Sequence, residues 1–226
     1  MDESRQAVDH APPGFRTRVD RAARTVLALV VLYWGLTLLG DQQPAGPPPQ
    51  PGAAQAFGTE QAGAAARNHA QAPLPAADPV RVVIPQIKVD APLMGLNLDD
   101  DGRLAAPPDS ERNLAGWYQE GTSPGASGTA ILGGHVDTAI GPAVFYALGS
   151  LNKGDTVQVP RTDGITAVFT VDAVEVYAAD DFPDTKVYGP STTPQLRLIT
   201  CGGGYDKKAG RYLGNVVVYA HLTGRA

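Results

Sequence analysis

The stretch LRLITCGGG, residues 196–204, joins a strand-forming run to the only cysteine of the 226-residue chain. Its apolar and β-branched residues favour a β-strand, and the three glycines after Cys201 predict a turn. A single thiol forms no internal disulfide and no multi-cysteine zinc site. Two interpretations of Cys201 are open at this point. It is either a small buried hydrophobic residue, or a nucleophile whose partner is a histidine from elsewhere in the chain.

Other strand-like runs lie on both sides of this stretch and are separated by turn signals. They cover residues 80–93, 128–136, 156–159, 167–177 and 215–221, in addition to residues 195–200 of the stretch itself. The first run is broken by prolines, which is typical of an edge strand. Residues 141–148, with Pro142 in the first turn, predict one short helix. Many short strands with little helix indicate a mainly β fold, either a barrel or a sandwich.

A run of uncharged residues, 25–40, follows a polar segment, residues 1–24, that holds five arginines. As a helix this run is about 24 Å long, which is short for a hydrocarbon core of about 30 Å. Arg21 and Arg24 can extend it by snorkelling. We interpret the run as an uncleaved transmembrane anchor; a cleaved signal peptide and a buried soluble helix are the alternatives. Arginines before it and Asp41 after it predict a single pass through the plasma membrane, with a cytoplasmic N-terminus and an extracellular domain.

Residues 41–78 are rich in Pro, Ala, Gly and Gln and show no apolar periodicity. Such a segment buries too little surface to offset its ordering entropy. It is therefore predicted to be a linker between the anchor and a folded domain at residues 79–226. The formal net charge of −5 gives no indication of nucleic-acid binding.

The predicted domain contains two histidines, His135 and His221. His135 ends a strand and follows two glycines, whose small size leaves it accessible, and Asp137 is near enough in sequence to orient it. His221 lies in an apolar run at the C-terminus and is interpreted as an ordinary surface or edge histidine. His135 is therefore the candidate partner of Cys201.

The sequences Gly-His-Val-Asp at residues 134–137 and Leu-Ile-Thr-Cys at residues 198–201 resemble the two signature motifs of sortases, the cysteine transpeptidases of Gram-positive cell surfaces. Flanking sequences at residues 116–118, 141–145 and 187–189 are similar to those of class F sortases of actinobacteria. The resemblance covers roughly residues 80–222, and the anchor and linker fit it as well.

The resemblance implies a closed eight-stranded sortase-type β-barrel with one or two short helices. It implies that Cys201, as thiolate, attacks the Thr carbonyl of an LPXTG-like sorting signal on a secreted surface protein and forms a thioester. His135, as imidazolium, protonates the leaving amine and later deprotonates the incoming one. The implied acceptor is an amine nucleophile of a peptidoglycan precursor or of a pilin, and neither a cofactor nor a metal is expected.

Sortases add an arginine that binds the substrate backbone and stabilises the oxyanion, and here the chain departs from the family pattern. The strand position after the cysteine holds Asn215, and the nearest arginine is Arg211, in the preceding turn. Arg197 lies four residues before Cys201 on the same face of the strand, and we predict Arg197 as the catalytic arginine, with Arg211 as its rival. Further contributions to the substrate site are predicted for Thr200, Gly202 and Asn215.

Two other functions are compatible with parts of the sequence. An L,D-transpeptidase also uses Cys and His outside the membrane, but it is expected to place a His-Gly pair directly before the cysteine, where this chain has Ile199 and Thr200. A non-catalytic, membrane-tethered β-domain with an inert buried Cys201 is the alternative without enzymatic activity. The accessibility of the thiol distinguishes that alternative from an enzyme.

Overall fold

The structure is a computed structural model that describes residues 46–58 and 71–226. The chain divides into two units, Met1–Ala45 and Gly46–Ala226, and only the second is described here. The predicted cytoplasmic segment, residues 1–24, and the predicted anchor, residues 25–40, lie outside the described residues. Within residues 46–58 and 71–226, no helix has the length and apolar character needed to cross a membrane.

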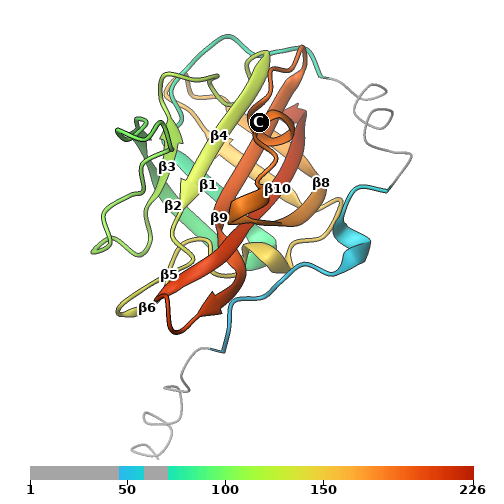
Figure 1. The fold of residues 1–226 in the computed structure, drawn as a ribbon. Coiled ribbons are helices and arrows are strands. Elements are labelled where there is room, and N and C mark those ends of the chain that lie inside the picture. Colours follow the sequence, from blue (N-terminus) through green and yellow to red (C-terminus); the bar gives the residue numbers. More distant parts are fainter. Residues whose placement is uncertain (1–45, 59–70) are drawn as a thin grey trace, which may run out of the picture. The chain divides into compact units, whose positions relative to one another are not determined.

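Eight strands close into a β-barrel in the order β1-β2-β3-β4-β9-β10-β8-β7 (Figure 1). The barrel strands are β1 Arg81–Ile84, β2 Val89–Leu96, β3 Ala115–Tyr118, β4 Gly128–Gly134, β7 Thr156–Pro160, β8 Thr166–Ala178, β9 Pro194–Asp206 and β10 Arg211–Arg225. A separate two-stranded sheet pairs β5 Asp137–Thr138 with β6 Gly141–Pro142. The predicted mainly β, closed eight-stranded barrel is confirmed.

Helical structure is sparse in the described part of the chain. It consists of the short α-helix α2 Asp184–Tyr188 and the 3₁₀ turns η1 Ala53–Gln55, η3 Pro85–Ile87, η4 Leu148–Ser150 and η5 Ala179–Asp181. The helix predicted for residues 141–148 is wrong. Ala143 N and Phe145 N donate to Val136 O and His135 O, both at 3.0 Å, while Tyr146 N and Leu148 N donate three residues back, to Ala143 O and Phe145 O. The segment therefore forms consecutive turns against the residues after β4, without the four-residue spacing of an α-helix.

The proline-broken run at residues 80–93 forms two strands rather than one edge strand. Pro85 opens η3, and Lys88 then takes a left-handed backbone conformation, with φ 56°, that turns the chain back into β2. β1 therefore pairs antiparallel with β2 on one side and with β7 on the other, so neither of its edges is exposed. The prediction failed because proline can end a strand at a turn as well as mark an edge.

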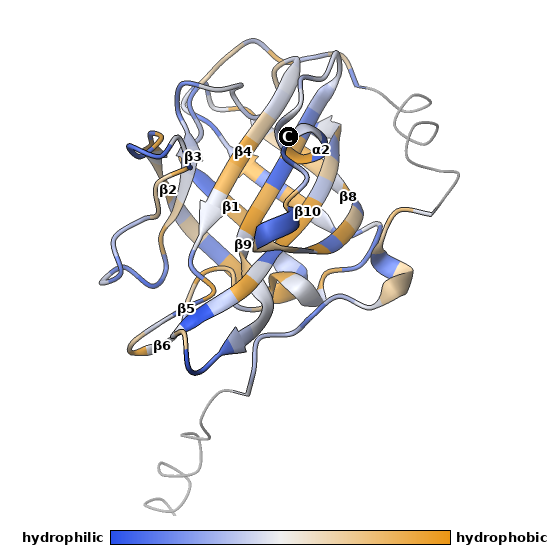
Figure 2. Ribbon diagram, in the orientation of Figure 1, coloured by the Kyte–Doolittle hydropathy of each residue, from blue (hydrophilic) through white to orange (hydrophobic). Residues whose placement is uncertain are grey.

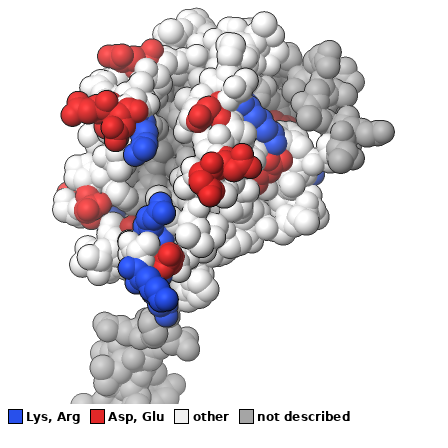
Figure 3. Space-filling view, viewed as in Figure 1, with Lys and Arg blue, Asp and Glu red and all other residues white. Residues whose placement is uncertain are grey.

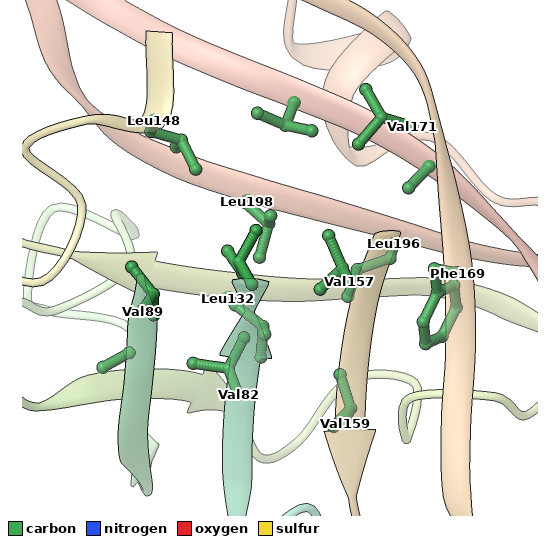
Figure 4. Packing of buried hydrophobic residues seen from close by; sticks show 14 of the residues in the cluster. Val82, Val89, Leu132, Leu148, Val157, Val159, Phe169, Val171, Leu196 and Leu198 are labelled. Carbon is green, nitrogen blue, oxygen red and sulfur yellow. The ribbon is translucent and has the colours of Figure 1, made fainter. Parts of the chain in front are cut away.

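The core lies inside the barrel and follows the two-residue alternation of the strands. On β9, Leu196 and Leu198 point inward and are fully buried, whereas Arg197, Ile199 and Cys201 belong to the outer face. Figure 4 shows Leu196 and Leu198 among side chains from the other barrel strands, including Leu132 and Phe169. Figure 2 shows the same alternation as orange and blue bands along the strands. The inward-pointing residues of the LRLITC sequence thus anchor β9 in the barrel core, and the residues that alternate with them lie on the outer face.

A smaller apolar cluster covers part of the outer face of β8, β9 and β10. Val187 of α2 packs there with Val217 and Tyr219 of β10, and Phe57 and Ile199 lie against them. The rings of Phe57 and Tyr219 meet edge to face with centroids 5.0 Å apart. The outer surface of β9 is therefore covered along part of its length and exposed at Cys201.

Two parts of the segment predicted as a linker are described, and both contact the barrel. The Tyr146 hydroxyl donates to Gly46 O, and Gly203 N donates to Gln50 Oε1 at 3.1 Å. Phe57 N donates to Glu175 Oε1 at 3.0 Å. In the second part, Leu74 is buried in the main core. Contacts with the barrel therefore begin before the domain boundary predicted at residue 79.

Candidate active site

Cys201 lies on β9, and His135 directly follows the last residue of β4, the parallel neighbour of β9. β4 and β9 run parallel, and their register places Gly133 opposite Ile199. Continuing this register two residues further, past the end of β4, places His135 next to Cys201. Because adjacent strands are about 4.8 Å apart, the two residues that the sequence separates by 66 positions become neighbours. The structure thus brings the two predicted catalytic residues together.

Thr200 ties these two strands together at this level. Its side chain is buried, and its hydroxyl donates to Gly134 O at 2.8 Å. The bond joins the residue before the cysteine to the residue before the histidine. Thr200 therefore supports the relative position of Cys201 and His135 and does not itself face the outer surface.

The His135 ring is held by the loop between β2 and β3. Its Nε2 lies 2.7 Å from Pro107 O and 3.2 Å from Asp109 Oδ1. Since a carbonyl oxygen can only accept a hydrogen bond, Nε2 carries a proton, and Nδ1 is the nitrogen that can exchange one. Asp109 has no local sequence signal, because its role depends on how a loop far from His135 in the sequence folds.

The Cys201 thiol is exposed, yet its surroundings do not favour the thiolate. Partial removal from water raises the pKa of Cys201, and the negative charge of Asp137 raises it further. A thiolate needs a cation beside it, since the reactive form is the anion. In this arrangement the imidazolium of His135 is the neighbour that can supply the positive charge.

Asp137 is bound to a residue that the sequence did not single out. The hydroxyl of Tyr212, on β10, donates to Asp137 Oδ2 at 2.5 Å. Burial and this bond to the carboxylate raise the pKa of Tyr212 above its usual range, so the proton stays on the phenol. The bond joins the segment after His135 to the strand that pairs with β9. The sequence suggested Asp137 as an orienter, but no local pattern pointed to Tyr212.

Asn215 and Gly202 lie where the sequence predicted a substrate site. Asn215 is the cross-strand partner of Cys201, and its Nδ2 donates to Thr200 O at 3.4 Å. Gly202 lies opposite Gly214 and is packed tightly, because a Cβ at Gly202 would come within 2.6 Å of Val216 Cγ2. Both residues therefore flank the nucleophile, one across the ladder and one along the chain.

Arg197 shares the outer face with Cys201 but is packed away from solvent. It is 8% exposed, and its guanidinium carbon lies 4.5 Å from the centroid of the Tyr219 ring. Nη1 donates to Leu196 O at 3.0 Å, and Nε has no partner in the described part of the chain. Burial lowers the pKa of Arg197. In this conformation its side chain is occupied by Tyr219 and by its own strand.

Arg211 is exposed at the first position of β10 and lies opposite Asp206. Within the described residues, neither it nor Arg197 donates a hydrogen bond to Cys201 or His135. The choice of Arg197 over Arg211 therefore stays a prediction. The two arginines differ in their surroundings. Arg197 is buried beside Tyr219, whereas Arg211 is exposed near the turn after Cys201.

Comparison with known proteins identifies the family. A family model described as the sortase domain matches residues 82–223, well over half of the chain. The chain belongs to the sortase family. The prediction of a sortase is thereby confirmed, and its catalytic motifs at His135 and Cys201 fall within the matched residues. Membership of class F stays a prediction.

Solved sortases share the fold of this chain at low sequence identity. Sortase A from Corynebacterium diphtheriae is 21% identical, with 66% of this chain and 62% of that chain covered and a TM-score of 0.47. Its lid mutant is 23% identical, with 66% and 73% covered and a TM-score of 0.50. Streptococcus agalactiae sortase C1 is 20% identical, with 65% and 69% covered and a TM-score of 0.50. No curated protein matches the chain.

Proposed function

We propose that this sortase is a membrane-anchored, extracellular cysteine transpeptidase that cleaves an LPXTG-like sorting signal and transfers the protein to an amine nucleophile of the cell wall. The observation that carries the proposal is the parallel pairing of β4 and β9, which sets His135 beside an exposed Cys201. Asn215 across the ladder and Gly202 next in the chain provide polar groups around the thiol.

In the first half of the reaction, the Cys201 thiolate adds to the Thr carbonyl carbon of the sorting signal. The C–N bond of the Thr-Gly peptide breaks, and the leaving amine takes a proton from the His135 imidazolium. The products are a thioester on Cys201 and a neutral imidazole. Because burial and the Asp137 charge raise the pKa of the Cys201 thiol, the thiolate needs a cation beside it, and we assign this role to the His135 imidazolium.

In the second half, the acceptor amine attacks the thioester carbonyl. Neutral His135 accepts the proton of the incoming amine, the C–S bond breaks, and the thiolate and imidazolium are restored. The acceptor belongs to a peptidoglycan precursor or to a pilin. Hydrogen bonds to the oxyanion come from backbone N–H groups near Gly202 and from one arginine, for which we propose Arg197 before Arg211.

The intermediate gives the decisive experiment. Incubation of the full chain with an LPXTG-type peptide should add the mass of the acyl fragment to Cys201, and an added amine should remove it. Cys201→Ala should show neither adduct nor product, while its melting temperature stays close to that of the wild type. Turnover by Cys201→Ala would exclude the mechanism. An alkylating reagent that failed to react with Cys201 in the folded chain would instead favour the non-catalytic domain.

The location in the membrane rests on the uncharged run at residues 25–40, with arginines before it. A charge near the middle of a transmembrane helix costs about 3 kcal/mol. Val30→Arg should therefore move the chain out of the membrane fraction, whereas Gln43→Arg, just after the run, should not. Proteolysis of intact cells should reach the catalytic domain; protection of that domain would contradict an extracellular location.

A further inference from the structure

A cleft of about 370 Å³ lies beside the segment that carries His135. It is bounded by the turn between β1 and β2, by the end of the β2–β3 connection and by residues 142–147. Its wall is apolar at Val89, Pro142 and Val144, and Lys88 and Arg112 supply two positive charges. The combination of an apolar wall with a few converging polar groups is typical of a ligand site.

Both walls of the cleft continue into the two segments that hold His135. On one side, Phe145 N donates to His135 O at 3.0 Å. On the other side, Arg112 lies near the end of the β2–β3 loop, and Asp109 of the same loop contacts His135 Nε2. Arg112 Nη1 also donates to Ile140 O at 3.4 Å, which joins the loop to the turn between β5 and β6. The cleft is therefore built on the two segments whose contacts hold His135.

The two cations of the cleft are not neutralised by the described part of the protein. Neither Lys88 nor Arg112 is among its ion pairs, although Asp90 and Glu111 are their near neighbours in sequence. Asp90 is engaged with Arg81, with Nε and Oδ1 2.5 Å apart. Lys88 is also the only non-glycine residue with a left-handed backbone in the described ranges. The cleft thus has an uncompensated positive charge in a chain whose formal net charge is −5.

The surface near the catalytic pair extends this positive charge. Lys207, Lys208 and Arg211 are exposed around the turn between β9 and β10, and none of them forms an ion pair with a described residue. Figure 3 shows Lys and Arg side chains at the lower end of the face, where Figure 1 places β5, β6 and this turn, with acidic side chains close to them and further charges of both signs higher up. These cations attract an anion, because a cluster of like charges steers an opposite charge, and they act against the carboxylates of Asp109 and Glu111 on the same loop as Arg112.

We propose that the cleft between Lys88 and Arg112 binds a negatively charged group, a carboxylate or a phosphate, on the amine acceptor. The inference rests on the proposed transpeptidase function and specifies its second substrate. The acceptor amine has to reach Cys201 from the side where His135 can take its proton, and the cleft opens beside the segments that hold His135. The sorting signal, in contrast, has to reach the exposed outer face of β9.

The test compares acceptors that differ only in charge. With one acyl-donor peptide at fixed concentration, transpeptidation is measured with diglycine against diglycinamide, and with O-phosphoethanolamine against ethanolamine. At low ionic strength, the anionic acceptor of at least one pair should react with a kcat/KM about fivefold higher than the reactivity of its amine alone predicts. Two charge contacts that are partly exposed to solvent account for an effect of about this size. The first pair reports on a carboxylate and the second on a phosphate.

Variants make the comparison independent of the reactivity of each amine. Lys88→Ala with Arg112→Ala should reduce the anionic-to-neutral ratio about fivefold, and Arg112→Glu should reduce it further. Arg225→Ala, at the far end of β10, is the matched control and should leave the ratio unchanged. Salt should weaken the preference in the wild type and not in the double variant.

The outcomes separate the two proposals. If thioester formation and transfer to neutral acceptors proceed, but the ratio is the same in the wild type and the double variant, the cleft is not the acceptor site. If no thioester forms on Cys201, the proposed function itself fails. Wild-type rates of thioester formation in each variant show that the variants are folded.

Discussion

His135 and His221 both face an aspartate, yet their surroundings differ in the feature that matters for catalysis. His135 follows the last residue of β4, next to Cys201, and its partner Asp109 is 90% exposed. His221 lies on β10 opposite Gln195, six residues before Cys201 on β9, which is about 20 Å along the strand. Its Nδ1 lies 2.7 Å from Asp172 Oδ1, and both side chains are largely buried. A His-Asp pair is thus not a site by itself; the neighbouring thiol is what makes His135 the predicted catalytic histidine.

Arg197 belongs to the His221 region in this structure. The Arg197 side chain packs on Tyr219, which lies two residues before His221 on the same face of β10. Its charge interacts with Tyr219 and Asp172 rather than with Cys201. The outer face of β9 therefore carries a buried polar region at one end and the nucleophile at the other. The predictions below test this separation, beginning with the largest expected effect.

Replacing each histidine should separate the two regions most clearly. His135→Asn should lower kcat/KM for transpeptidation by about 10³-fold, because the leaving amine loses its proton donor. His221→Asn should change it less than about twofold, since it lies too far away for proton transfer. The measurement is steady-state kinetics with an LPXTG-type peptide and an amine. A large loss from His221→Asn would show that the two regions are coupled.

Arg197→Ala should lower the free energy of unfolding by about 2 kcal/mol. The variant loses the contact with the Tyr219 ring and a hydrogen bond in a buried setting. Chemical denaturation measures the effect, and Arg211→Ala, an exposed residue, is the control and should change stability by less than about 0.5 kcal/mol. The kinetic comparison of the same variants tests the catalytic choice: we expect Arg197→Ala to lower kcat/KM more, and the reverse order would assign that role to Arg211.

Tyr212→Phe should lower kcat/KM about fivefold at neutral pH. Tyr212→Phe removes the hydroxyl that donates to Asp137. The Asp137 charge then acts more strongly on the nearby thiol, so the pKa of Cys201 should rise further. The rate of thiol alkylation against pH measures this shift directly. Tyr205→Phe, which changes an exposed ring that meets the Tyr212 ring edge to face, is the control. Adding Asp137→Asn to Tyr212→Phe should bring the alkylation profile back towards lower pH; no shift in either variant would remove Asp137 from the account.

The smallest effect concerns the pH dependence of stability in the His221 region. The hydrogen bond to Asp172 raises the pKa of His221. A raised folded-state pKa means that the pair contributes fully below the unfolded value of about 6.5 and loses this contribution as the pH rises through the folded-state value. Asp172→Asn should therefore destabilise the chain by about 1 kcal/mol at pH 5.5 and by less at pH 8.5. Melting curves at the two pH values measure it; an equal loss at both would mean that the His221 charge plays no part.

The sequence by itself determined the fold class and predicted the catalytic pair. Alternating apolar and polar residues specify strands locally, because successive side chains point to opposite faces, and the runs around Leu198 and Val218 accordingly became β9 and β10. The motifs around His135 and Cys201 could be recognised because both the chemistry and the neighbouring glycines are local in sequence. In contrast, the helix predicted for residues 141–148 failed, because its backbone found partners on another segment.

Only the tertiary structure decided which groups surround the catalytic pair. Three residues from other segments reach the site. Asp109 contacts His135, Tyr212 donates to Asp137, and Gln50 accepts from Gly203 N. The parallel pairing of β4 with β9 and the packing of Arg197 on Tyr219 are likewise contacts between distant residues. Local patterns encode which residues form strands. The order of the strands in a closed barrel depends on contacts made by the whole chain, and this order decides which side chains become neighbours.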